Sequence, residues 1–183
     1  MKSFTLLFCS FIIFSCNKNI INDESKIIIK CEKIIIQDSI DDNEIAFLIS
    51  YYNPTEENID IYANTFSNKK NYKNIGIFIK NRGVEVPLEQ FLPDSVFSIQ
   101  SKSKIKLLYS YGKKCSSWKN IFSKDKAITK QLKKIHLFYK PTKINTNNNK
   151  HPIEVNIDYK SIYYKKEINI EEALNLIGGK VKK

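Results

Sequence analysis

The chain has 183 residues, a formal net charge of +11 and 42% hydrophobic residues, with only 5 Gly and 5 Pro. This length suffices for one globular domain that buries about two-thirds of the surface of its unfolded chain. The composition excludes a disordered, a collagen-like and a disulfide-scaffold protein. No apolar run reaches the ~20 residues of a membrane-spanning helix, which excludes a polytopic membrane protein.

Lysine carries nearly all of the positive charge, because Lys and Arg total 30 residues and Arg82 is the only arginine. Proteins that read nucleic acids favour arginine, whose planar guanidinium binds phosphate and guanine through two hydrogen bonds at once. We therefore expect no nucleic-acid partner in spite of the high net charge.

The first sixteen residues read MKSFTLLFCSFIIFSC, a basic residue followed by an apolar stretch from Phe4 to Phe14. This stretch is too short to span a bilayer, and the layout is typical of a secretory signal peptide. It ends in Ile13-Phe14-Ser15-Cys16. That ending resembles the lipobox of bacterial lipoproteins, in which a small residue precedes an invariant cysteine.

The resemblance implies that residues 1–15 are a signal peptide and that Cys16 becomes the first mature residue. Its thiol would carry a diacylglycerol and its amine usually a further palmitate-like chain, and two or more chains give a stable anchor. Residues 16–25 then form a lipidated tether. Asn17 is similar to the residue that follows the cysteine in outer-membrane lipoproteins. We expect a lipid-anchored envelope protein. The resemblance implies the outer membrane, on either its periplasmic or its surface face.

From Lys26 onward, segments rich in β-branched and aromatic residues recur roughly every 10–15 residues with almost no helix between them. Asn53-Pro54 marks a turn, and Asn81-Arg82-Gly83 predicts a three-residue hairpin loop. The predicted strands are Lys26–Ile36, Glu44–Tyr52, Asn58–Phe66, Asn74–Lys80, Val84–Leu88, Ser95–Gln100, Lys104–Tyr111, Lys133–Lys140 and Ile153–Lys166.

This rhythm resembles the immunoglobulin-like sandwiches of bacterial envelope lipoproteins. The sequence thus predicts one all-β domain over residues 26–183, an antiparallel β-sandwich of about eight strands, with a β-barrel as the alternative. Near the C-terminus, apolar residues at helical spacing between Asn169 and Gly178 predict a short helix at about residues 170–177. It either docks on the edge of the sandwich or binds a partner.

Few residues point to particular chemistry. Cys31 and Cys115 form either a disulfide, as an oxidising compartment favours, or two buried thiols. Tyr163 and Tyr164 are adjacent on a strand, so one ring faces outward and is a candidate binding contact, with strand packing as the alternative. Two sites, Ser39 and Ser95, each follow an Asp and precede an apolar residue. Their pattern resembles an O-glycosylation signal of exported bacterial proteins.

The two histidines, His136 and His151, lack the spacing of metal ligands, and no phosphate loop or nucleophile elbow occurs. We therefore expect no metal, no cofactor and no catalytic role. The predicted function is that of a lipid-anchored envelope protein that interacts with another envelope protein. The alternatives are a periplasmic inhibitor or immunity lipoprotein that acts through a Lys-rich face, and a glycan- or lipid-binding domain.

Overall fold

The computed structural model describes residues 23–38, 43–65, 75–92, 94, 96–112, 121–122, 127–141, 152–157, 159, 162–165, 172 and 175–177. Over these residues the chain is mostly β, which confirms the predicted class. It also has one short α-helix, α2 (Ile128–Leu132), and a 3-10 turn, η1 (Glu24–Lys26).

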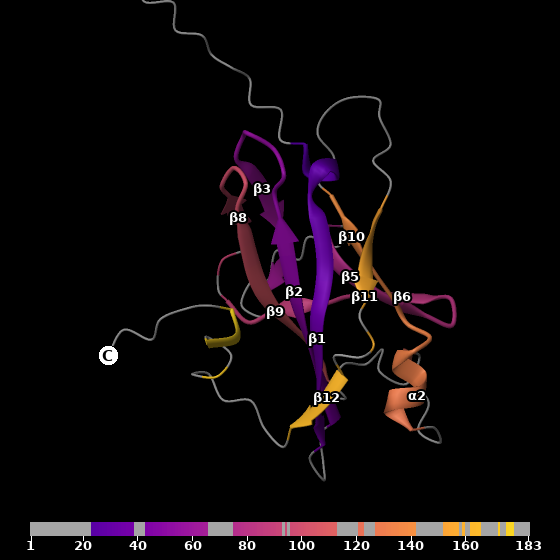
Figure 1. Cartoon of the computed structure of the whole chain (residues 1–183). Helices are drawn as coiled ribbons and strands as arrows, with labels where there is room; N and C mark the ends of the chain where they lie inside the picture. The colour runs from indigo at the N-terminus through magenta and orange to yellow at the C-terminus, as the bar shows by residue number, and fades with distance from the viewer. Residues whose placement is uncertain are drawn as a thin grey trace, which may run out of the picture.

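Ten strands form one mixed sheet in the order β4-β7-β9-β2-β1-β11-β10-β5-β6, with β12 paired to β1 (Figure 1). A second sheet pairs β3 with β8. The strands are β1 (Ile28–Asp38), β2 (Asn43–Tyr52), β3 (Ile59–Tyr62), β4 (Asn64–Thr65), β5 (Gly76–Asn81), β6 (Val84–Pro87), β7 (Glu89–Gln90), β8 (Val96–Ile99), β9 (Lys104–Gly112), β10 (His136–Lys140), β11 (Ile153–Ile157) and β12 (Ile162–Lys165).

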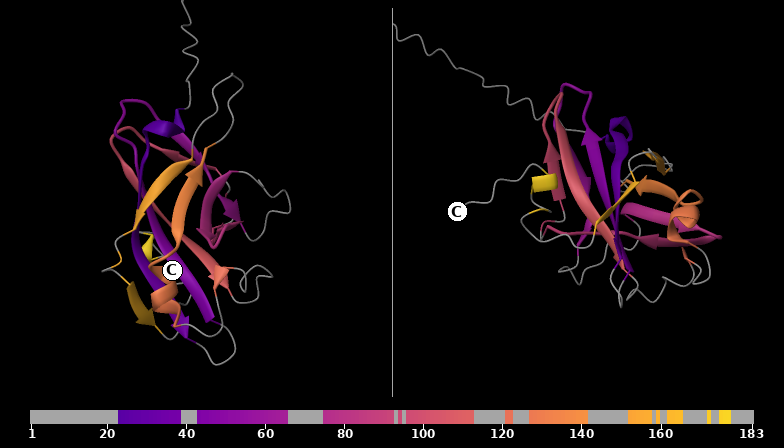
Figure 2. Two further views of the ribbon diagram at one scale, coloured as in Figure 1. Left: turned by 90° about the vertical axis from the view of Figure 1, so that its right-hand side faces the viewer. Right: turned by 60° about the horizontal axis from the view of Figure 1, so that its bottom comes forward.

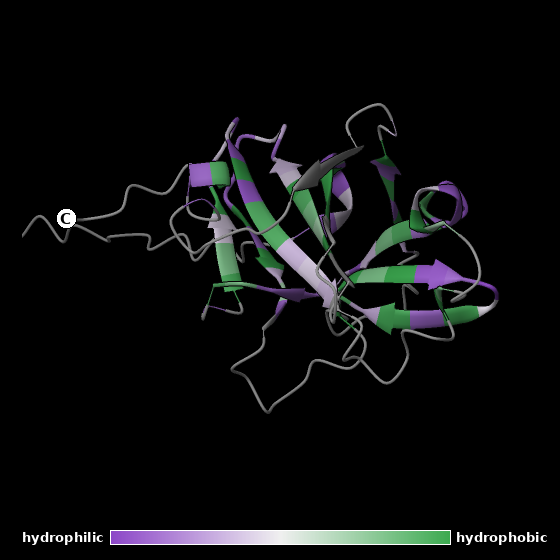
Figure 3. Cartoon of the chain, turned by 90° about the horizontal axis from the view of Figure 1, so that it is seen from below, coloured by the Kyte–Doolittle hydropathy of each residue, from purple (hydrophilic) through white to green (hydrophobic). Residues whose placement is uncertain are grey.

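The large sheet curls until it is nearly closed into a barrel, as the view from below shows (Figure 3). This arrangement is closer to the barrel alternative than to a sandwich of two sheets. The expectation of a purely antiparallel sheet is wrong. The strands β11 and β12 run parallel to β1, and β4 runs parallel to β7. The reason is that β11 pairs antiparallel with β10 and lies between β10 and β1, so it runs beside β1 in the same direction.

Alternation of apolar and polar residues along the central strands produces the core. In β1, Ile29, Cys31, Ile34 and Ile36 are all buried in the main cluster, and Ile49 and Tyr51 of β2 pack with them. A β-bulge between Cys31 and Lys33 inserts one extra residue in β1. The buried positions therefore change from odd to even residue numbers at this point, and the strand faces the core along its full length. The sequence pattern alone hides that shift.

Two connections differ in detail from the prediction. The strand predicted over Ile153–Lys166 is interrupted, since β11 pairs with β1 at Lys30 and Cys31, and β12 pairs with it from Ile34 onward. The hairpin between β5 and β6 has a two-residue turn, not a three-residue loop, because Asn81 still pairs with Val84. Arg82 and Gly83 both have positive φ, 51° and 77°, which is the geometry of a type I′ turn.

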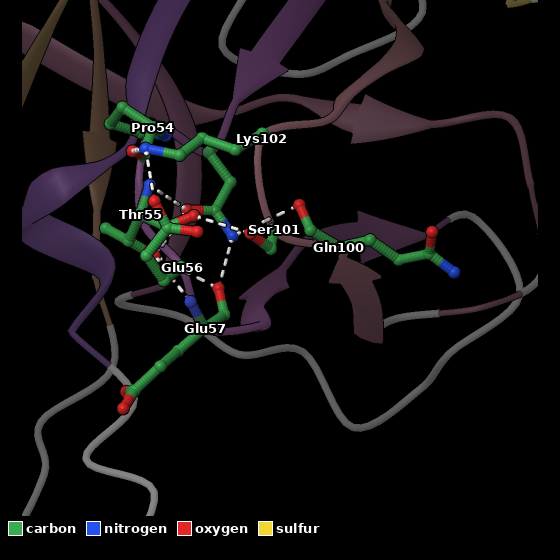
Figure 4. A network of polar contacts seen from close by, with 8 residues as sticks. Pro54, Thr55, Glu56, Glu57, Gln100, Ser101 and Lys102 are labelled. Carbon is green, nitrogen blue, oxygen red and sulfur yellow. Dashed lines mark hydrogen bonds and ion pairs between the residues drawn. The ribbon is translucent and has the colours of Figure 1, made fainter.

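At the end of the barrel near η1, hydrogen bonds join the loop at residues 53–58 to the loop at residues 100–103 (Figure 4). We call this pair of loops the clasp. Asn53 is fully buried, and its Nδ2 donates to the carbonyls of Glu57 at 2.6 Å, Ile99 at 3.0 Å and Gln100 at 3.2 Å. Lys102 closes the clasp by donating from Nζ to the carbonyl of Pro54 at 2.7 Å. The Asn53 side chain therefore adds to the two backbone hydrogen bonds between the loops, from the Asn53 amide to the Ser103 carbonyl and from the Lys102 amide to the Thr55 carbonyl.

The outer face of the sheet carries a small second cluster, formed by Ile35, Ala46, Leu48 and Leu108. Leu176 and Ile177 pack against it, and Glu172, Asn175 and Leu176 are helical. These residues belong to the helix predicted at about 170–177, whose other positions lie outside the described residues. The C-terminal segment therefore covers apolar surface on the outside of the barrel wall.

Candidate functional site

An open groove of about 740 Å³ lies between β8 and β9. Its lining includes the apolar side chains of Leu92, Val96, Phe97, Ile105, Leu107 and Leu176. We call it the β8–β9 groove. The groove exists because β8 pairs with β3 and not with β9, although the two strands are consecutive in the chain.

Gln90 fixes the shape of the turn that leads into the groove. Its side chain is buried, and its Nε2 donates to the carbonyls of Leu92 at 2.5 Å and Asp94 at 2.6 Å. Its Oε1 accepts from the Leu92 amide at 2.6 Å. Three hydrogen bonds from one buried amide define a rigid turn, so Gln90 is a positioning residue for the rim of the groove.

Two large apolar side chains stay exposed at this turn. Phe91 is 45% exposed and Val96, at the start of β8, is 44% exposed. Phe91 precedes Leu92 of the groove lining, and its amide donates to the carbonyl of Leu108 in β9. A half-exposed aromatic ring beside an apolar groove is a candidate protein-binding patch, because aromatic residues are enriched at protein interfaces.

Lysine side chains border the same groove. Lys104 and Lys106 of β9 line it and both form ion pairs with Glu32, the Lys106 pair at 3.3 Å. Burial acts to raise the pKa of Glu32, but hydrogen bonds and charge from the two lysines outweigh it and lower that pKa. Both lysines are about half exposed, at 45% and 40%, and remain accessible to an acidic partner.

A second, smaller pocket of about 470 Å³ lies over β10 and β11. It is lined by His136, Glu154, Asn156 and Tyr159 among others, and Tyr159 donates from its hydroxyl to the carbonyl of Ile135 at 3.2 Å. Burial and the neighbouring Cys31 raise the pKa of Tyr159. His136 is exposed. The pocket combines acid, imidazole and phenol groups with the apolar side chains of Ile135, Leu137, Val155 and Ile157.

The interior of the barrel is filled with aromatic side chains. Tyr51 and Tyr109 share a hydrogen bond of 2.5 Å between their hydroxyls, and the Tyr51 and Tyr139 rings meet edge to face at 6.2 Å. Tyr139 donates to the carboxyl group of Glu24 and accepts from the Tyr62 amide at 3.1 Å. Burial is the largest cause that raises the pKa of all three buried tyrosines. These buried polar groups form hydrogen bonds with one another, and we assign them a role in stability.

Of the residues predicted to carry chemistry, Cys31 is a free thiol with no exposed surface, and it donates to the Lys33 carbonyl at 3.5 Å. Burial raises its pKa to about 12. Tyr163 and Tyr164 lie in β12, opposite Ile35 and Ile36 of β1. Cys16, Cys115, Ser39, Ser95 and His151 lie outside the described residues.

Sequence reasoning missed Gln90, Phe91 and Glu24. The sequence offers one indication for Gln90. The apolar pair Phe91-Leu92 follows it in a predicted loop, which indicates that part of this loop packs against the core. Glu24 was assigned to the tether, whereas it is fully buried.

Within the described part of the chain, no group of three or more His, Cys, Asp or Glu side chains is arranged to hold a metal ion. Among the same residues, no helix has the length and hydropathy to cross a membrane. Comparison of the chain with protein-family models, with curated proteins and with solved structures finds no match.

Proposed function

We propose that this chain is a lipid-anchored protein of the bacterial cell envelope and that its barrel is a non-catalytic module that binds another envelope protein. The anchor is a diacylglycerol on Cys16, and the β8–β9 groove is the binding surface. The observation that carries the proposal is the exposed pair Phe91 and Val96, which a hydrogen-bonded turn holds beside an apolar groove.

Support for the anchor comes from the N-terminal sequence. A basic residue, an apolar stretch and Ser15-Cys16 occur in the order that a lipoprotein signal requires. The described structure begins seven residues after Cys16, at Asp23, which caps η1. A lipid anchor on Cys16 would therefore be connected to the domain by only a few residues.

Metabolic labelling with an alkyne fatty acid tests the anchor in a host that expresses the full chain. The native chain should incorporate label and float with membranes, and Cys16→Ala should lose both. Cys115→Ser is the control and should keep both. Label that persists in Cys16→Ala would overturn the assignment of the anchor.

Site-specific photo-crosslinking tests the groove. A benzoylphenylalanine at position 96 should yield one recurrent protein adduct in membranes of the native host, and the same probe at the exposed Lys133 beyond α2 should not. Phe91→Ser should reduce the adduct at position 96 several-fold, because aromatic anchors contribute most of the binding energy of an interface. Equal adducts at both positions would argue against the groove.

A second function, inhibition of an acidic partner through lysines, is favoured by the position of Lys104 and Lys106 on the groove wall. Exposed charge pairs are screened by salt, whereas apolar contacts are not. A complex that dissociates at high salt would support the inhibitor role, and one that persists would support the apolar groove. Glycan or lipid binding inside the barrel has less support, because buried tyrosines fill the interior.

A further inference from the structure

The barrel has two distinct ends, and the N-terminal segment enters at one of them. η1, the loop at residues 53–58 and the loop at residues 100–103 lie at the same end, and α2 and β12 lie at the other (Figures 1 and 2). The register agrees, since β1 starts at η1 and β10, which follows α2, runs antiparallel to β11, itself parallel to β1. We call these the η1 end and the α2 end.

Glu24 fixes the N-terminal segment to the η1 end. Its side chain has no exposed surface, and its carboxyl group accepts a hydrogen bond from Tyr139 in β10. Tyr139 is itself bound to the Tyr62 amide of β3 at 3.1 Å. Glu24 is thus bound directly to β10 and, through Tyr139, to β3. A tether that leads from Cys16 to the domain therefore ends no later than Asp23.

The length of that tether limits the orientation of the domain. Eight residue steps separate Cys16 from Glu24, which span at most about 29 Å. β1 has 11 residues, and its ten residue steps of about 3.3 Å make it about 33 Å long. Barrel strands tilt by about 35–45° from the axis, so the wall is somewhat shorter than β1. A domain standing on its α2 end would therefore need the tether to be almost fully extended along the wall, at a large cost in conformational entropy.

We propose that the η1 end of the barrel faces the lipid bilayer to which Cys16 is anchored, and that the α2 end is held away from it. This inference rests on the lipid anchor proposed above. The η1 end contacts the surface of that bilayer, because the tether is short and starts at the lipidated Cys16.

The chemistry of the η1 end agrees with contact at the level of lipid headgroups. Two ion pairs lie there, Lys26 with Asp23 at 3.7 Å and Lys102 with Glu56 at 3.0 Å, and the exposed Glu57 adds a further negative charge. Ile28, the first residue of β1, is 57% exposed at this end. A small acidic excess gives no electrostatic attraction to headgroups, and one aliphatic side chain does not support deep insertion. The tether, and not electrostatic attraction, therefore sets the orientation.

Fluorescence quenching in vesicles tests the orientation. Two variants of the full lipidated chain, both with Cys115→Ser, carry a fluorophore at Glu56→Cys or at Lys130→Cys. Glu56 is 81% exposed at the η1 end, and Lys130 is exposed on α2. Each variant is reconstituted into phosphatidylcholine vesicles that contain a lipid with a spin-labelled headgroup.

We expect at least about threefold stronger quenching at position 56 than at position 130, because the two positions lie at opposite ends of the barrel (Figure 1). Insertion of a long Gly-Ser segment after Asn17 should remove most of this difference. Equal quenching at both positions in the native tether, or a difference that survives the insertion, would overturn the proposal. Failure of the anchor itself gives a different result, since the protein would then not float with the vesicles at all.

Discussion

The hydroxyl of Tyr139 donates a hydrogen bond to the carboxyl group of Glu24, a residue 115 positions earlier in the chain. Both side chains have no exposed surface, so the bond joins the first turn of the folded domain to a strand near its end. A buried acceptor that loses its donor costs far more than the net value of the bond, because water cannot replace the donor.

Tyr139→Phe should therefore lower the free energy of unfolding by about 1–3 kcal/mol, the usual cost of such a buried polar group. The ring and its edge-to-face contact with Tyr51 are retained, so the loss reports the hydroxyl alone. Urea denaturation measures the change. The matched control is Tyr159→Phe, since Tyr159 is 37% exposed and also donates to a carbonyl. Equal losses in the two variants would contradict a special role for the Glu24 contact.

The three buried tyrosines also predict the response to alkaline pH. Burial is the largest cause that raises the pKa of Tyr51, Tyr109 and Tyr139 above the usual value of 10.0. The folded state therefore keeps protons that the unfolded state releases above that pH. Stability should be complete below about pH 10 and fall above it, by about 1.4 kcal/mol per pH unit for each tyrosine.

Urea denaturation across this pH range checks the slope. The double variant Tyr51→Phe with Tyr109→Phe should show a shallower fall, because only Tyr139 of the three then remains to titrate. Absorbance of tyrosinate should rise further on unfolding of the native chain than of the double variant. A slope that is the same in both proteins would show that other groups cause the alkaline loss.

The positions of the strands were predictable, but their partners were not. Ile59, Ile61 and Ala63 alternate toward one face in the sequence, and the structure buries all three. Parallel pairing of β1 with β11 joins residues such as Lys30 and Asn156, and no local pattern encodes so distant a contact. The β8–β9 groove could not be predicted for the same reason, because it exists only since β8 pairs with β3 and not with β9.

Single buried polar residues were equally hard to predict. Glu24 stands in a polar stretch of the sequence and Gln90 in a predicted loop, and acids and amides in such segments are usually exposed. Their burial follows from the tertiary hydrogen bonds that they form, with Tyr139 for Glu24 and with the turn at Leu92 for Gln90. A composition-based interpretation therefore assigned one to a tether and the other to a loop.

Asn53 should be among the least tolerant positions in the chain. Its Nδ2 donates to three carbonyl oxygens, those of Glu57, Ile99 and Gln100. Asn53→Asp would place a carboxylate oxygen against these carbonyls in a buried site, and should cost about 3 kcal/mol or more in unfolding free energy.

Asn58→Asp provides the matched control for urea denaturation. Asn58 is exposed and uses its Oδ1 to accept from the Ser101 amide at 3.1 Å, which an aspartate also does. The control should change stability by less than about 0.5 kcal/mol. Similar losses at both positions would mean that added negative charge, and not the lost donor, destabilises the clasp.

The C-terminal segment should contribute to both stability and binding. Leu176 and Ile177 cover the outer apolar cluster that contains Leu48 and Leu108, and both also line the β8–β9 groove. The double variant Leu176→Ala with Ile177→Ala removes several partly buried methyl and methylene groups, so it should lose about 2 kcal/mol in urea denaturation.

The same double variant should also reduce the photo-crosslink from position 96, because one wall of the groove recedes while Phe91 stays in place. Asn175→Ala is the control, since Asn175 lines the same groove but is exposed, and it should change stability by less than about 0.5 kcal/mol. A variant that is destabilised but keeps the full crosslink would show that the segment supports only the barrel wall. Loss of both properties would place the partner against this segment as well as against β8.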